Sequence, residues 1–157
     1  MTAAAPTRRS VLLSALALTA LPALPLRAAG PEMHVAKDPD CGCCADWIAI
    51  VQAAGIAVTV EEMAPDALQR HKAALGVPGA MRSCHTGQIG GYAIEGHVPV
   101  ADILRLLETR PEAVGLAVPG MPYGSPGMGP EEEREAYDVV LIRADGSTEV
   151  FARYPAA

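Results

Sequence analysis

Three of the four cysteines in the chain occupy four consecutive positions, as Cys41, Cys43 and Cys44. Cys41 and Cys44 have the C-x-x-C spacing of a thiol redox site. Simple disulfide exchange needs two sulfurs, however, and Cys43 between them would compete by forming the wrong bridge. Three thiolates within four residues suit a soft ion such as Cu(I) or a borderline ion such as Zn(II). The spacing therefore predicts a site for metal or redox chemistry, because the cysteines of a disulfide framework would be spread along the chain.

The fourth cysteine, Cys84, lies in the segment Arg-Ser-Cys-His-Thr just before a predicted strand. We expect it to converge on the other three, and the alternative is a small buried hydrophobe. His85 can face the same site if this segment is still a turn, and we predict that it is a metal ligand or contacts the ligands. His97 precedes a helix start; it could approach the site or be exposed, and we favour the second interpretation. His34 and His71 have no other candidate ligand near them in the sequence and are interpreted as ordinary surface or packing residues.

Two methionines lie in a segment rich in glycine and proline, which together fill nine of the sixteen positions from 115 to 130. This composition predicts an irregular loop. Met121 and Met128 have no helical face to fill there, and a thioether is a soft ligand suited to Cu(I). The alternative is that both side chains only pack the loop onto the core. We expect the loop to fold over the cysteines, with both methionines as candidate ligands.

The pattern of apolar residues predicts strands and helices in the order β-α-β-α-β-β-α. A first strand over 33–37 is followed by the cysteines and then by a helix over 45–54. The cysteines would thus lie at a helix N-terminus, where free N–H groups and the positive end of the helix dipole favour thiolates. A helix between two strands predicts a parallel, right-handed crossover, and the whole order predicts a four-stranded mixed sheet with helices on both faces. The other predicted elements are a strand over 56–60, a helix over 65–75, strands over 86–89 and 92–95, and a helix between Pro99 and Pro111 that buries Val100, Ile103, Leu104 and Leu107.

After the loop at 115–130, the sequence predicts an acidic helix start and then a hairpin. Glutamates fill four of the five positions 131–135, and Asp145-Gly146 is a hairpin signal between strands over 137–143 and 148–154.

Residues 1–29 have the pattern of an export signal. The pair Arg8-Arg9 begins a charged region, and the apolar run over 11–26 is shorter than the roughly 20 residues that span a bilayer. An arginine pair of this kind resembles a twin-arginine signal, and the alternative is a retained membrane anchor. We predict export into a Gram-negative periplasm, with no stable membrane insertion after signal removal. Reduced thiols in that oxidising compartment need a reductant or a bound metal.

The residues after this leader hold nine basic and 18 acidic side chains. Such a balance excludes nucleic acid as a partner, since binding there depends on neutralising phosphates with Lys and Arg. Only 4% of the residues are aromatic, so the core is predicted to be aliphatic. The length is that of a single domain.

Four separate motifs resemble the CopG-type family of periplasmic copper-resistance proteins. They are Cys-Gly-Cys-Cys after a strand, Arg-Ser-Cys-His-Thr, Gly-Tyr-Ala-Ile-Glu-Gly-His-Val-Pro, and the segment from Gly115 to Met128. The resemblance extends over about 33–154. It implies a thioredoxin-like domain, here 30–111, with a C-terminal extension over 112–157 that packs on the same domain and reaches the metal site. It also implies copper bound at the C-x-C-C motif and interconversion of Cu(I) and Cu(II).

The leading hypothesis is therefore a copper-binding redox protein of copper resistance with a thiolate site for several copper ions. The alternatives are a copper chaperone or buffer that hands Cu(I) to an efflux system, a metal-free thiol-disulfide oxidoreductase, and a structural zinc site. The candidate catalytic residues and copper ligands are Cys41, Cys43, Cys44 and Cys84, and the further candidate ligands are His85, Met121 and Met128.

Overall fold

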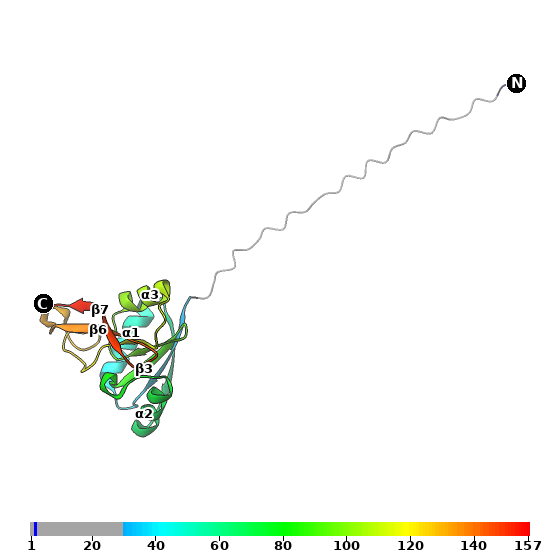
Figure 1. Ribbon diagram of the computed structural model, residues 1–157. Helices are drawn as coiled ribbons and strands as arrows, with labels where there is room; N and C mark the ends of the chain where they lie inside the picture. The colour runs from blue at the N-terminus through cyan, green and yellow to red at the C-terminus, as the bar shows by residue number, and fades with distance from the viewer. Residues whose placement is uncertain (1, 3–29) are drawn as a thin grey trace.

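Seven strands form one mixed sheet, in the order β2-β1-β3-β4-β5-β6-β7. The structure is a computed structural model that describes Thr2 and residues 30–157, so the predicted export signal lies outside the described residues except for Thr2. Within the described part, no helix is both long and apolar enough to cross a membrane. The elements are shown in Figure 1 and comprise β1 (Glu32–Lys37), α1 (Gly42–Ala53), β2 (Ala57–Glu62), α2 (Pro65–Ala74), the 3-10 turn η1 (Gly79–Met81), β3 (His85–Ile89), β4 (Tyr92–Glu95), α3 (Val100–Thr109), β5 (Gly115–Ala117), the 3-10 turn η2 (Glu131–Glu133), β6 (Tyr137–Ile142) and β7 (Thr148–Tyr154).

The connection from β1 to α1 places the cysteines at the start of the helix. The carbonyl of Asp38 accepts a hydrogen bond from the Cys41 N–H at 3.1 Å, and the Asp38 carboxylate accepts one from the Asp40 N–H at 2.9 Å. This turn ends at Cys41, and α1 begins at Gly42, three residues earlier than the pattern predicts. Cys43 therefore lies in the first helical turn, where N–H groups lack partners within the helix. The pairing of β1 with β2 is parallel, as predicted for two strands joined through a helix.

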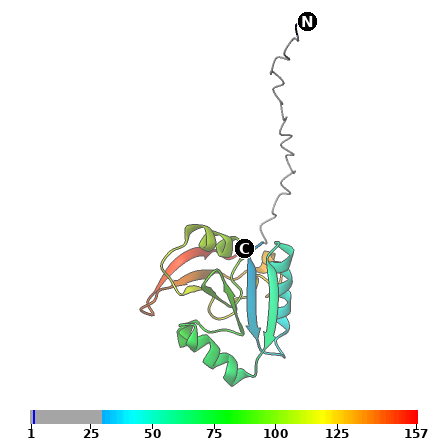
Figure 2. The same cartoon turned by 90° about the vertical axis from the view of Figure 1, so that its right-hand side faces the viewer.

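Helices cover both faces of the sheet, as Figure 2 shows. On one face the core joins Trp47 of α1 and Ile103 of α3 to Ile94 of β4. The preceding residue of the strand points the opposite way, so that Ala93 packs with Val77, just after α2, on the other face. This arrangement confirms the predicted α/β, thioredoxin-like fold. Leu104 is 46% exposed, so its predicted place in the core is wrong; Leu106 is buried instead.

The C-terminal residues extend the same sheet beyond the four predicted strands. β5 pairs parallel to β4 and antiparallel to β6. The prediction of an irregular loop over 115–130 is therefore wrong for 115–117, which form β5. It is correct for 118–130, which contain no helix or strand. Gly115 explains the error, because a Cβ at this position would lie 1.7 Å from the Ala93 carbonyl oxygen. A glycine that reads as a loop signal is here required for the close approach of two strands. The predicted hairpin is present as β6 and β7, whereas the acidic run forms only the short turn η2.

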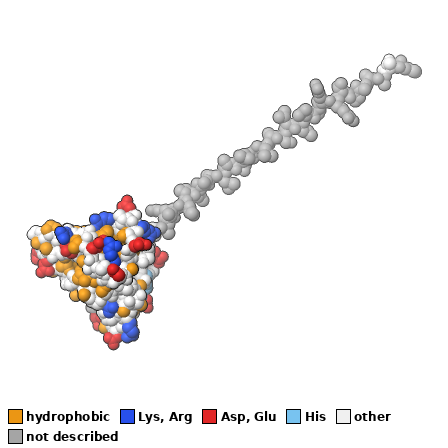
Figure 3. All heavy atoms as spheres, in the orientation of Figure 1, with side chains coloured by type: hydrophobic (Ala, Val, Ile, Leu, Met, Phe, Trp, Pro, Cys, Tyr) orange, Lys and Arg blue, Asp and Glu red, His pale blue; other side chains and the backbone are white. Residues whose placement is uncertain are grey.

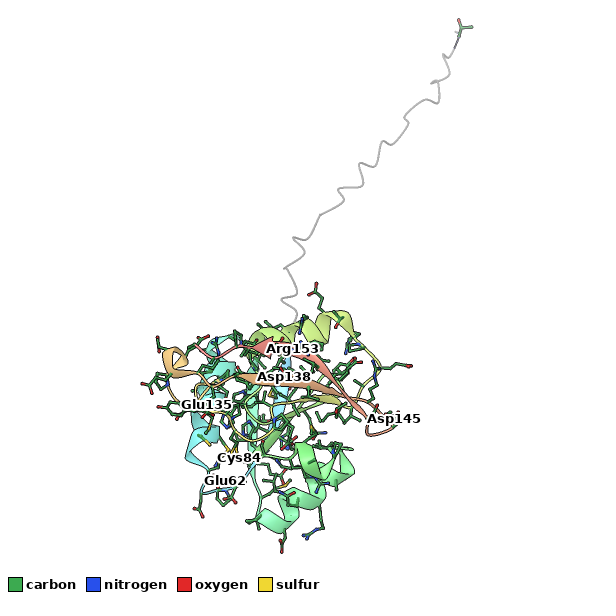
Figure 4. The ribbon with its side chains drawn as sticks, turned by 60° about the vertical axis from the view of Figure 1, so that its left-hand side comes forward. Glu62, Cys84, Glu135, Asp138, Asp145 and Arg153 are labelled. Carbon is green, nitrogen blue, oxygen red and sulfur yellow. A yellow bond between two sulfur atoms is a disulfide. The ribbon has the colours of Figure 1, made fainter. Side chains whose placement is uncertain are left out.

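The two edges of the sheet, β2 and β7, both carry charged side chains. β2 ends in Glu61 and Glu62. On β7, Arg153 lies opposite Asp138 of β6, with 3.8 Å between the charged groups, as Figure 4 shows. The pairing of β6 with β7 has an irregularity at Val139/Val140. On the face drawn in Figure 3, acidic and basic side chains are interspersed.

The loop over 118–130 packs directly on α1. A Cβ at Gly127 would lie 2.7 Å from the backbone nitrogen of Trp47. Gly127 has a φ of +81°, and Gly120 in the same loop has a φ of +78° with nothing within 4 Å of its Cβ position. The two glycines therefore differ in their surroundings and hardly in their backbone conformation.

We expect Gly127→Ala to destabilise the protein by about 1–3 kcal/mol more than Gly120→Ala, because only the first substitution overpacks the contact with α1. The left-handed backbone penalty is common to both variants and cancels in the comparison. Urea unfolding of the two variants measures the difference. Equal unfolding free energies would contradict the close contact between loop and helix.

Candidate metal centre

The four cysteine sulfurs form one cluster, with all Sγ atoms within 4.8 Å of one another. A disulfide joins Cys41 to Cys44, whereas Cys43 and Cys84 are free. The Sγ atoms of Cys41 and Cys43 are 3.5 Å apart. The predicted convergence of Cys84 is thus confirmed, and Figure 4 shows its position within the domain. Reduction of the disulfide would present four thiols at one place, a donor set that soft metal ions prefer.

Cys84 also belongs to a second group, in which two imidazoles approach its sulfur. His85 Nδ1 lies 3.4 Å and His97 Nε2 lies 3.6 Å from Cys84 Sγ. The ligand atoms of these three residues also lie within 4.8 Å of one another. Cys84 is therefore shared by an all-sulfur group and a mixed sulfur–nitrogen group.

The loop fixes the orientation of His97. Its Nδ1 lies 2.8 Å from the carbonyl oxygen of Pro126, which can only accept, so Nδ1 carries the proton. In the neutral ring this leaves the lone pair of Nε2 directed toward Cys84. Burial lowers the pKa of His97, which favours this neutral form. A hydrogen bond from the second ring nitrogen to a carbonyl is the usual support of a metal-binding histidine.

His85 is a neutral base in the interior. It is fully buried, and its ring lies 4.4 Å from that of Trp47 between centroids. Burial first, and then the nearby His97 and Lys72, lower its pKa to about 3. Its Nε2 has no hydrogen-bond partner among the described residues. His85 therefore offers an unprotonated nitrogen over the whole neutral pH range, as a ligand must.

Cys84 itself is a thiol when the site is empty of metal. Burial and the neighbouring Cys43 raise the pKa of its thiol to about 12. A thiolate at Cys84 therefore needs a cation to stabilise it, and binding of a metal ion would displace the proton. The site therefore favours a thiolate at Cys84 only when a metal ion is bound.

A cavity of about 480 Å³ opens beside the sulfurs of Cys41, Cys43 and Cys84. Met121 lines it and is 39% exposed, with a φ of +49° that few residues other than glycine adopt. Met128 is not among the described residues that line this cavity. A larger cavity of about 650 Å³ lies over the C-terminal hairpin, and its described lining includes no cysteine or histidine.

Most of the predicted site residues come together, and one was missed. Cys41, Cys43, Cys44, Cys84 and His85 share one region, and Met121 reaches its cavity. That these residues bind a metal stays a prediction. The list of predicted ligands lacked His97. The favoured interpretation of His97 as exposed is wrong and the alternative, that it approaches the site, is confirmed, because its side chain is fully buried beside Cys84.

The fold and the cysteine cluster together define the class of this protein: an α/β, thioredoxin-like domain with a cysteine-rich potential metal site at the start of its first helix. Residues 81–128 match a family model described as protein of unknown function, DUF411. Two solved structures, both named copper resistance protein CopG (forms 1 and 2), share 48% sequence identity and a TM-score of 0.74 with the chain. The alignments cover 80% of this chain and 98% and 99% of the solved chains. No curated protein sequence matches the chain significantly. At this identity and coverage, the chain belongs to the CopG family.

Proposed function

We propose that this protein binds copper at Cys41, Cys43, Cys44 and Cys84 and reduces Cu(II) to Cu(I) there. The name of its two solved relatives, copper resistance protein, supports the choice of metal. The donor set supports it as well, because thiolates stabilise Cu(I) and imidazoles bind both copper ions. The reaction belongs to the periplasm if residues 1–29 export the chain, as their pattern predicts.

One observation carries the redox part of the proposal: a disulfide between Cys41 and Cys44 coexists with the free thiols of Cys43 and Cys84 in the same cluster. The four sulfurs can thus divide two tasks. Cys41 and Cys44 supply electrons when their S–S bond forms. Cys43 and Cys84 stay reduced and keep the product bound.

The electron balance follows from this division. Two Cu(II) ions each accept one electron, the Cys41–Cys44 disulfide forms, and the two thiol protons leave to water. An external dithiol then restores the pair by thiol-disulfide exchange and is itself converted into a disulfide. Copper is the substrate in this cycle, and the dithiol is the second substrate.

The mixed group around Cys84 is where Cu(I) would be held. Cys84 gives a bridging sulfur, and His85 and His97 add neutral nitrogens. The shared position of Cys84 in both groups favours a site for more than one copper ion. The bound Cu(I) would then leave to an efflux system or a copper carrier, in keeping with a role in copper resistance.

The function test is a single turnover with the exported protein, reduced and freed of metal under anaerobic conditions. Addition of excess Cu(II) should yield two Cu(I) per protein, read with a chromophoric Cu(I) chelator, while titratable thiols fall from four to two. A chaperone or buffer would bind copper, keep all four thiols and yield no Cu(I). The matched control, Cys41→Ser with Cys44→Ser, lacks the electron-donating pair and should lose this stoichiometric yield.

The methionines of the loop have their own test. We expect Met121→Leu to weaken Cu(I) binding by about tenfold or more, because leucine keeps the apolar bulk at the cavity and removes the sulfur. Met128→Leu is the comparison within the same loop, and it should weaken binding only if the loop brings this second sulfur to the metal. Competition with a Cu(I) chelator measures both. Wild-type affinity in the Met121 variant would leave Met121 as a packing residue.

A further inference from the structure

Lys72 and Glu95 form an ion pair in the interior of the protein. Lys72 lies on α2 and Glu95 on β4, and both side chains are fully buried. The Lys72 Nζ donates to Glu95 Oε1 at 2.5 Å. The cysteine cluster uses neither charge as a ligand, so the pair needs another explanation.

The two charged side chains also form hydrogen bonds with the backbone of the residues before and after Cys84. The Lys72 Nζ donates to the carbonyl oxygens of Ser83 at 2.9 Å and of His85 at 3.0 Å, which uses all three ammonium protons. Glu95 Oε1 accepts the Ser83 N–H at 2.6 Å and its hydroxyl at 3.3 Å. Lys72 and Glu95 thus bind three backbone groups, the N–H and carbonyl of Ser83 and the carbonyl of His85, in the two residues that flank Cys84.

The segment they hold lies outside the regular elements, and Arg82 at its start is bound separately, through its N–H to the Gly79 carbonyl at 3.3 Å and through its Nε to the Val77 carbonyl at 3.1 Å. Residues 82–84 lie between η1 and β3 and belong to no helix or strand. Ser83 also packs against Gly96, where a Cβ would lie 2.6 Å from the Ser83 hydroxyl oxygen. This close packing restricts movement toward β4. The His85 carbonyl also accepts the Gly96 N–H at 3.3 Å, whereas the carbonyl and N–H of Ser83 are bound by Lys72 and Glu95.

Stability alone does not account for the pair. Replacement of a buried ion pair by well-packed apolar residues is often neutral or stabilising, because the charges lose their hydration on burial. Apolar side chains cannot bind carbonyl and N–H groups, however. What the pair contributes beyond packing is therefore the direction of the backbone at Cys84.

We propose that Lys72 and Glu95 are positioning residues that hold the Cys84 sulfur against Cys43, His85 and His97, and so assemble the copper site from its two halves. The inference rests on the proposed function for its copper part only, since the position of Cys84 can be measured without metal.

The test replaces the pair in the full, exported chain with apolar residues of similar size, as Lys72→Met with Glu95→Leu. In the reduced, metal-free variant, iodoacetamide should alkylate Cys84 about tenfold faster than in the wild type, because a released segment exposes the thiol. Mass spectrometry of the Cys84 peptide reads this rate separately from the other cysteines. Affinity for Cu(I) should fall by about 10- to 100-fold, as when residues that support metal ligands are changed.

Two further variants separate positioning from general stability. Glu95→Gln keeps an acceptor oxygen for Ser83, so it should change both readouts less than the double variant. Asp102→Asn alters another buried polar group, which binds Tyr154 at 2.7 Å and Arg105 at 3.0 Å on the other side of the molecule's core, and should leave both readouts unchanged. If the double variant does not fold, Glu95→Gln tests the inference alone: Cys84 alkylation faster than in the wild type and in Asp102→Asn supports it, and an unchanged rate overturns it.

Unchanged Cys84 alkylation in a folded double variant overturns the inference, as does an equal effect of Asp102→Asn. Faster alkylation with unchanged Cu(I) affinity supports the positioning of Cys84 and contradicts its role as a copper ligand, which is a failure of the proposed function. Faster alkylation together with weaker Cu(I) binding supports both.

Discussion

Cys84→Ser is expected to lower the affinity for Cu(I) by at least about 100-fold, the upper end of what changes to supporting residues cause. The reason is that Cys84 is shared: it is the fourth sulfur of the cysteine group and the only sulfur of the group with His85 and His97 among the described residues. A serine hydroxyl is a poor ligand for a soft ion. One substitution therefore damages both groups.

Competition with a Cu(I) chelator measures this loss, and Cys43→Ser is the matched control. Cys43 belongs only to the all-sulfur group, so its replacement should leave the sulfur–nitrogen group able to bind. The Cys41–Cys44 disulfide should still form in both variants. Wild-type copper affinity in Cys84→Ser would show that the metal is bound without the second half of the site.

The second large effect is a loss of stability in acid, caused by His85. The pKa of this histidine is about 3 in the folded protein, against an ordinary value of about 6.5 in an unfolded chain. Between these two values the unfolded state binds a proton that the folded state does not, so the free energy of unfolding falls as the pH is lowered from about 6.5 toward 3. Above about pH 7 both states hold a neutral ring, so that His85 causes no loss of stability there.

Urea unfolding of the metal-free protein at pH 7, 5 and 4 tests the effect. His85→Leu should reduce the dependence of the unfolding free energy on pH, whatever it does to stability at pH 7, because a leucine binds no proton. His34→Leu changes a histidine at the surface and serves as the comparison. An acid dependence in His85→Leu as steep as in the wild type would mean that other groups cause it.

Patterns local to one element predicted the α/β fold and the placement of the cysteines. Trp47 and Val51 mark the buried face of α1, and Gly55 ends it, so that the helix must start near the cysteines. What this reasoning could not see was the close approach at Gly115, since a glycine that permits two strands to touch has the same sequence signal as one in a loop. The extension of the sheet from four strands to seven depends on that contact.

The position of His97 beside Cys84 could have been predicted from the register of the hairpin that lies between the two residues. The hairpin around Gly90-Gly91 pairs Ile89 with Tyr92 and Thr86 with Glu95. Continuing this register by two residues places Cys84 opposite His97, which the structure confirms. The buried pair of Lys72 and Glu95 had no comparable signal, because Lys72 on α2 and Glu95 on β4 meet only through the packing of helix on sheet.

The charged edges of the sheet bear on how this protein behaves at high concentration. An open sheet offers unpaired N–H and C=O groups at its outermost strands, and a second copy could add a strand there. Pairing two copies along β2 would bring Glu61 and Glu62 of each copy into one ribbon of like charge. At the other end, the irregular pairing of β6 with β7 disturbs the flat surface that strand addition needs. The sheet that brings the four cysteines together therefore carries, at both of its edges, features that disfavour the addition of another strand.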